Sequence, residues 1–76
     1  MNYRLFLKDS IIPIEIGTEL TDFRGDKWVL TGCMPPHNSN SSGRVNVRHI
    51  TEPVNTPAWK NSSFFPSVFD CEFRLV

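Results

Sequence analysis

DFRGDKWVLTG, residues 22–32, contains a tight turn and the strand that follows it. The turn is predicted at residues 24–26, because Gly25 takes a positive φ at little cost and its neighbours tolerate a tight bend. The strand is predicted at residues 27–31, since Trp, Val, Leu and Thr suit a pleated, half-buried surface. Gly32 is expected to end it. We expect the rest of the chain to be arranged around this turn and strand.

The chain has 76 residues and a formal net charge of zero. This length predicts one domain, residues 1–76, with no room for both a core and a deep enclosed pocket. The neutral balance disfavours a strongly basic nucleic-acid binder and an acidic mimic of DNA, because each works through an excess of one charge. No apolar run is long enough to span a membrane, and two cysteines are few for a secreted domain of this size. We therefore expect a cytoplasmic protein whose Cys33 and Cys71 are buried, reduced thiols.

Strands are further predicted at residues 1–8, 44–50 and 70–76, where apolar and polar residues alternate. Residues 11–16 are apolar and β-branched, but Pro13 cannot donate a ladder hydrogen bond, so an edge strand or an irregular crossing is expected there. The segment 34–43, MPPHNSNSSG, is predicted to be a flexible loop, because it offers nothing to bury and shows no period.

No ten-residue stretch has a helical period, so the predicted fold class is all-β: five short strands curled into a small barrel, which leaves no exposed sheet edges. A single helical turn is expected in FFPSVF, residues 64–69, before the last strand. This order of parts is similar to that of SH3-like barrels, in which an aromatic-Pro-Ser turn precedes the last strand. The aromatic motifs with which SH3 domains grip polyproline are not recognisable, so that activity is not expected. The predicted core is Leu5, Leu7, Phe23, Trp28, Leu30, Val45, Val47, Phe69, Cys71 and Phe73.

A second resemblance covers most of the chain and is more specific. From Gly17 to Phe73 the sequence resembles small uncharacterised open reading frames of tailed bacteriophages. The matching pieces are Asp22-Phe23-Arg24-Gly25, Trp28, Gly32, Pro35-Pro36, Ser42-Gly43-Arg44-Val45 and Phe64-Phe65-Pro66-Ser67-Val68-Phe69. The resemblance implies a phage accessory protein that is produced in the cytoplasm of a bacterial host. It brings no catalytic residues with it.

Three constellations that would carry chemistry are disfavoured. Cys33, His37, His49 and Cys71 include the ligand types of a zinc site, but structural zinc sites pair their ligands closely, and only the first two are close in sequence. Histidines beside many serines suggest a base and a nucleophile, yet no third group is placed to orient either imidazole. The acids are scattered singly, unlike the clusters that hold catalytic metals. We expect no enzyme, no metal and no cofactor.

The remaining hypotheses concern binding. Trp59, among loop residues, is a candidate anchor for a protein partner, and the loop residues Met34 and His37 are expected to take part as the loop orders on contact. Arg44 and Arg48 share one face of a predicted strand, and beside an aromatic side chain they would resemble the surface of a single-strand nucleic-acid binder. The sequence therefore predicts a non-enzymatic protein that binds and modulates a host or phage protein. The first alternative is a nucleic-acid-binding SH3-like module that uses the face around both arginines, and a third possibility is a small part of a virion or of a self-assembly.

Overall fold

The computed structural model describes residues 2–38 and 40–76. The elements are β1 (Tyr3–Leu7), β2 (Glu19–Thr21), β3 (Lys27–Met34), β4 (Arg44–His49), the 3₁₀ turn η1 (Ala58–Lys60), β5 (Ser62–Phe64), the 3₁₀ turn η2 (Pro66–Phe69) and β6 (Cys71–Leu75). The prediction of an all-β protein is confirmed, and so is the single helical turn before the last strand. No helix within the described residues is long and apolar enough to cross a membrane.

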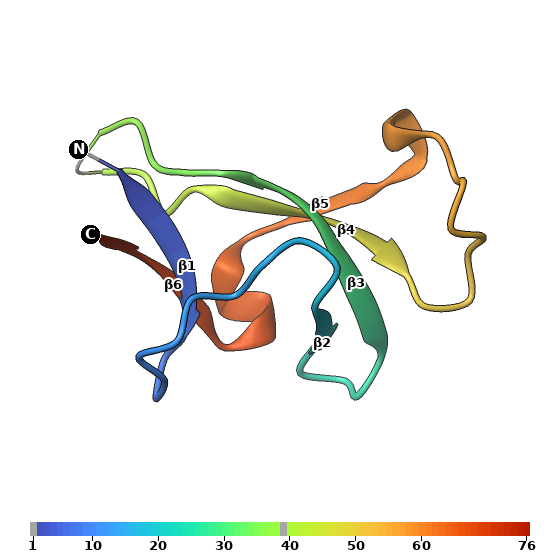
Figure 1. Ribbon diagram of the computed structural model, residues 1–76, viewed down its shortest axis with the longest axis horizontal. Coiled ribbons are helices and arrows are strands. Elements are labelled where there is room, and N and C mark those ends of the chain that lie inside the picture. The colour runs from blue at the N-terminus through green and yellow to red at the C-terminus, as the bar shows by residue number, and fades with distance from the viewer. Residues whose placement is uncertain (1, 39) are drawn as a thin grey trace.

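The strands form two antiparallel sheets (Figure 1). One has four strands in the order β2-β3-β4-β5, and the other pairs β1 with β6. The expected five-stranded barrel is not confirmed, because the strands number six and no pairing within the described residues closes the two sheets into a barrel. Two strands lie outside the predicted ranges: β2, which pairs with the start of β3, and β5, which pairs with β4. Residues 11–16 form no strand; the Ile14 N–H donates to Leu5 C=O at 2.7 Å, which makes this segment the irregular crossing that Pro13 allows.

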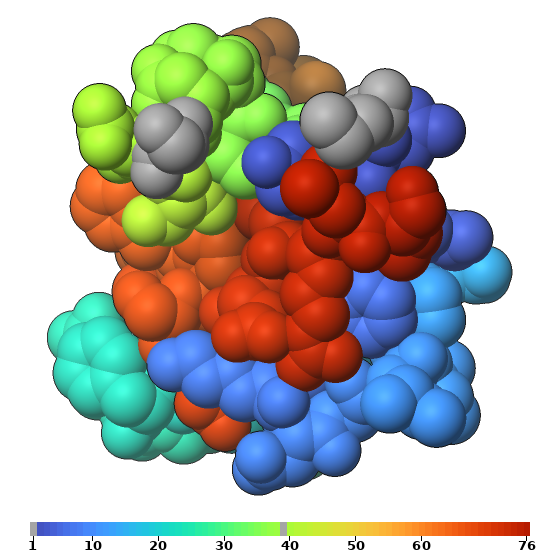
Figure 2. All heavy atoms as spheres, turned by 90° about the vertical axis from the view of Figure 1, so that its left-hand side faces the viewer, coloured from blue at the N-terminus to red at the C-terminus, as the bar shows by residue number. Residues whose placement is uncertain are grey.

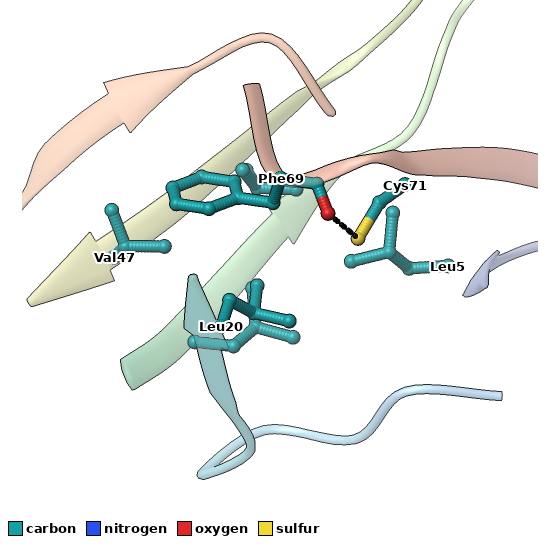
Figure 3. Close-up of a cluster of buried hydrophobic side chains, with 7 residues drawn as sticks. Leu5, Leu20, Val47, Phe69 and Cys71 are labelled. Atoms are coloured by element: carbon teal, nitrogen blue, oxygen red, sulfur yellow. Dashed lines mark hydrogen bonds between the residues drawn. The ribbon is translucent and has the colours of Figure 1, made fainter. Parts of the chain in front are cut away.

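The core lies where side chains from both sheets and from η2 meet (Figure 3). It consists of Leu5, Leu20, Leu30, Val45, Val47, Phe69 and Cys71, with Trp28, Phe64 and Phe73 packed against it half-buried. Two predicted core residues are wrong: Leu7 is 44 % exposed at the end of β1, and Phe23 is 78 % exposed. Leu20 and Phe6 are buried although neither was predicted to be.

A turn that includes Gly25 is confirmed, but it spans residues 22–25 and not 24–26, because the Gly25 N–H donates to Asp22 C=O at 3.0 Å; Asp22 organises it. The Asp22 carboxylate accepts hydrogen bonds from the backbone N–H of Arg24 (2.8 Å), the backbone N–H of Asp26 (3.0 Å) and the Trp28 indole N–H (3.1 Å). Gly25 adopts the positive φ that the turn requires, at 89°. Because the Asp22 side chain turns inward, where it is only 7 % exposed, the next side chain, Phe23, points to solvent.

The strand after this turn is longer than predicted. β3 continues past Gly32 to Met34, so the expectation that Gly32 ends it is wrong. A register shift between Leu30 and Gly32 inserts Thr31 as an extra residue, after which Gly32 pairs with Asn46 of β4. A Cβ at Gly32 would lie 3.4 Å from the Asn46 side chain, which is ordinary van der Waals contact, so Gly32 continues the strand beside its cross-strand neighbour.

Opposing effects act on the pKa of Asp22. Burial of the carboxyl raises its pKa, but the hydrogen bonds from Trp28 and from the backbone of Arg24 and Asp26, with the charge of Arg24, outweigh burial and hold the pKa below its ordinary value. A carboxyl with a lowered folded pKa contributes stability that is fully present above the unfolded pKa. That contribution is lost as the pH falls through the folded pKa.

Replacing Asp22 with asparagine is expected to lower stability at pH 7 and to flatten the acid limb of the stability curve. The asparagine oxygen can still accept from the backbone, but its NH₂ group cannot accept from the Trp28 indole, and it does not titrate. Urea midpoints of the wild type should fall below about pH 4, and those of Asp22→Asn should fall less. The exposed acid Asp9 provides a control, Asp9→Asn, which should follow the wild type. If the urea midpoint of Asp22→Asn fell with pH as steeply as that of the wild type, Asp22 would not be the group that causes the acid loss of stability.

Arg74 of β6 forms hydrogen bonds with the turn that follows β1. Its guanidinium donates to the backbone carbonyls of Ser10 (2.6 Å), Lys8 (2.7 Å) and Leu7 (3.2 Å), and its Nε–H donates to the Glu72 carboxylate. The same guanidinium lies 4.8 Å from the centre of the Phe6 ring. Phe6, on the opposite face of β1 from the core residue Leu5, is therefore covered by a cation and not by a second sheet, which explains why it is buried.

Candidate binding surface

The structure divides the predicted binding residues between two ends of the molecule. Met34, His37 and Arg44 come together and line a shallow pocket of about 200 Å³ beside the loop that joins β3 to β4. Trp59 belongs to η1, which lies at the opposite end of the longest axis from this loop (Figure 1). A single compact partner site that uses all of the predicted residues is therefore not present.

Met34, Arg44 and Phe65 form a continuous exposed surface that we call the Arg44 patch. Arg44 pairs with Met34 in the β3–β4 register, and its guanidinium lies 4.6 Å from the centre of the Phe65 ring. Its Nε–H donates to Ser63 Oγ at 2.9 Å, and a terminal N–H donates to Ser63 C=O at 3.2 Å. Met34 is 44 % exposed and Phe65 is 53 % exposed. The arginine is thus held in one orientation beside two exposed apolar side chains.

Phe65 was missed by the sequence analysis, although the chain contains a signal for it. Phe64 and Phe65 are adjacent at the end of a strand, and successive side chains of a strand point to opposite faces. Phe64 packs edge-on against Trp28 and Phe69, with ring centres 5.2 Å and 5.8 Å apart. Phe65 is therefore directed to the outer face, where it meets Arg44.

Arg44 and Arg48 do share the outer face of β4, as predicted. Val45 and Val47, which lie between the two arginines in the strand, point inward and are fully buried. Both guanidinium groups are already engaged within the chain, Arg44 with Ser63 as above and Arg48 with Glu52 C=O at 2.7 Å. The positive face exists, but its hydrogen-bond donors are partly satisfied by the protein itself.

Trp59 is 79 % exposed, and no residue of η1 is buried. The Lys60 ammonium lies 5.2 Å from the centre of the Trp59 ring. The aromatic ring is thus confirmed to lie at the surface, but it is carried by an isolated turn with the equally exposed Val54 on the segment leading to it. Its surroundings are more open than those of the Arg44 patch.

The loop between β3 and β4 is held against β6 by a glycine. Gly43 has φ of +72°, and a Cβ on it would lie 2.7 Å from Met34 C=O and 2.8 Å from the Phe73 ring. On the other side of the loop is a larger hollow of about 320 Å³. The hollow is lined by Tyr3 of β1, by Cys71, Glu72 and Phe73 of β6, by Pro66 and Ser67 of η2 and by the loop.

The expectation of two buried thiols is half wrong. Cys71 is 2 % exposed and its thiol contacts Phe69 C=O at 3.3 Å, whereas Cys33, near the end of β3, is exposed. Burial, with the negative charges of Asp70 and of an ionised Cys33, raises the pKa of Cys71 to about 11, and the partial desolvation of the Cys33 thiol raises its pKa as well. Neither thiol is thus activated as a nucleophile. Within residues 2–38 and 40–76, no three His, Cys, Asp or Glu side chains lie close enough together to hold a metal ion.

No protein-family model matches this chain, and neither a curated protein nor a solved structure shows significant similarity to it. The side chains that the Arg44 patch presents, methionine, arginine and an aromatic ring, are the types that are enriched at the centres of protein interfaces.

Proposed function

We propose that this protein is a non-enzymatic binding module, encoded by a bacteriophage, that binds and modulates a host or phage protein through the Arg44 patch. The observation that carries the proposal is that the Arg44 guanidinium lies over the exposed Phe65 ring with its orientation fixed by Ser63, while the exposed Met34 pairs with Arg44 in the neighbouring strand. A side chain that is already ordered loses little conformational entropy on binding, which favours affinity at such a position.

The partner is a protein in this proposal because the long-range attraction that a polyanion needs is weak. The formal net charge is zero, and the donors of both outward arginines on β4 are partly used inside the chain. The alternative function is nucleic-acid binding by Arg44 and Arg48, which is favoured by one observation: the arginine stacked on Phe65 resembles the pairing of cation and aromatic that single-strand binders use.

The origin and the type of module belong to the same proposal. The phage origin is supported by the sequence resemblance through DFRG at residues 22–25 and FFPSVF at residues 64–69, which also implies production in the cytoplasm of a bacterial host. The description as an SH3-like module is supported by the order of the elements, in which η2 directly precedes the last strand, β6. The patch residue Phe65 lies at the junction of β5 and η2.

A pull-down from bacterial lysate, with and without nuclease, tests the proposal. The wild type should retain a protein whose recovery does not depend on nuclease treatment. The variant Met34→Ala/Phe65→Ala should retain at least about ten-fold less, because truncating side chains at the centre of an interface removes most of the binding energy. Both side chains are about half exposed, so circular dichroism should show that this variant is folded.

The matched control is Trp59→Ala, which removes a larger exposed ring from the opposite end of the molecule. It should retain the partner at the wild-type level. Loss of the partner with Trp59→Ala and not with the patch variant would show that the wrong surface is proposed. Retention that nuclease abolishes, and that falls steeply with salt and with Arg44→Ala/Arg48→Ala, would establish the nucleic-acid alternative instead.

A further inference from the structure

The strand β6 has a free edge. In an antiparallel ladder, alternate residues direct both their N–H and C=O groups towards the paired strand. The Lys8 N–H donates to Asp70 C=O and the Val76 N–H donates to Asn2 C=O. In residues 70–76, the even-numbered residues therefore direct their backbone N–H and C=O groups towards β1. Cys71, Phe73 and Leu75 therefore direct their N–H and C=O groups away from β1. Among the described residues, no backbone group pairs with them.

This edge differs from the other sheet edges of the molecule. The outward carbonyls of Leu5 and Leu7 on β1 are used by Ile14 N–H and Ser10 N–H. The edge strands of the larger sheet, β2 and β5, have three residues each, whereas β6 has five. The β6 sequence CEFRL contains no proline or lysine, and its register with β1 has no bulge. Proteins often protect an exposed edge with a proline, a lysine or a bulge, and β6 has none of these three.

The space beside this edge is open. The hollow of about 320 Å³ is lined by the first three residues of β6, and the loop between β3 and β4 and the start of η2 form its other walls. Figure 2 shows this face, with β6 in red and the lime loop and an orange segment beside it. The walls combine apolar surface from Tyr3, Phe73 and two prolines with serine and asparagine side chains. The residues that line the hollow include a single charged side chain, that of Glu72.

We propose that this edge binds an extended peptide segment of another protein, which adds to the β1–β6 sheet as a third strand beside β6. Backbone hydrogen bonds to Phe73 and Leu75, the two outward-facing residues of β6 that are not fully buried, supply the affinity, and alternate side chains of the segment enter the hollow. These side chains are apolar, since Tyr3, Phe73 and two prolines line the hollow and the Glu72 carboxylate is already paired with Arg74. The site goes beyond the proposed function, because it uses backbone groups and a hollow on the other side of the loop from the Arg44 patch.

A library of random heptapeptides tests this site with the full chain as bait. Leu75→Pro removes an outward N–H that has no partner within the described chain, and Leu75→Ala removes the same half-exposed side chain but keeps the N–H. Peptides selected on the wild type should bind Leu75→Ala within about two-fold and Leu75→Pro at least about ten-fold more weakly. On peptide addition, the backbone amide of Phe73 should exchange with solvent at least about ten-fold more slowly, because it becomes hydrogen-bonded.

Several outcomes would overturn the proposal. One is that no peptide is enriched, and another is that enriched peptides bind Leu75→Pro as well as Leu75→Ala without protecting the Phe73 amide. A third is that the free protein dimerises and that Leu75→Pro alone abolishes the dimer, which would show that a second copy occupies the edge. The Met34→Ala/Phe65→Ala variant should still bind the selected peptides, so a failure of the patch and a failure of the edge are distinguishable.

Discussion

Gly43→Ala is expected to lower the free energy of unfolding by about 2–5 kcal/mol. The left-handed backbone at this position, with φ of +72°, costs an L-residue about 1–2 kcal/mol. The added Cβ would also lie within 2.8 Å of the Phe73 ring and closer still to Met34 C=O, and relieving such overpacking costs about 1–3 kcal/mol. A domain of 76 residues has a total stability of only about 4–11 kcal/mol, so this variant would be largely or partly unfolded in mild denaturant.

Gly17→Ala separates the two causes. Gly17 also has a positive φ, of +95°, but nothing lies within 4 Å of the place where its Cβ would be. Gly17→Ala should lower the free energy of unfolding only by the cost of the left-handed backbone, about 1–2 kcal/mol. Urea unfolding followed by tryptophan fluorescence measures both variants, since Trp28 packs against the core. Equal losses in the two variants would mean that the contact of Gly43 with Met34 and Phe73 has no energetic consequence.

Arg74→Ala is expected to cost about 2–4 kcal/mol, because hydrogen bonds made by a charged group contribute about 1.5–3 kcal/mol each and this side chain is partly exposed. The substitution removes the donors to three carbonyls of residues 7–10 and uncovers Phe6. Arg74→Lys should recover less than half of the loss, since an ammonium cannot reproduce the planar fork that reaches several carbonyls at once. Denaturant titration and amide exchange in β1 measure the effect.

The control for charge is Arg4→Ala. Arg4 lies directly opposite Arg74 in the β1–β6 register, is exposed, and places a like charge beside it. Its removal should leave stability unchanged or raise it by about 0.5 kcal/mol, because like charges opposite each other in a sheet repel. If Arg4→Ala were as destabilising as Arg74→Ala, net charge on this sheet, and not the bonds of Arg74, would control its stability.

Local patterns in the sequence were sufficient for the fold class and for several elements. Period-two alternation identified β1, β4 and β6, and the aromatic-Pro-Ser segment identified η2, because each depends on the preferences of residues close together in the chain. The turn that includes Gly25 follows for the same reason, from a glycine with positive φ and a neighbouring aspartate. The burial of Val45 and Val47 and the outward direction of Arg44 and Arg48 also follow from alternation alone.

Only the tertiary structure decided which alternating face is covered, and by what. Phe6 is buried because Arg74, 68 positions along the chain, lies over it, whereas Phe23 is exposed because the Asp22 side chain takes the inward position. The grouping of Met34 with Arg44 and Phe65, the separation of Trp59 from them, and the free edge of β6 depend on the register and order of strands. Register is set by packing and by hydrogen bonds between strands that are distant in the sequence, and the register shift at Thr31 is one example. A local sequence pattern contains no information about which strand will pair with it.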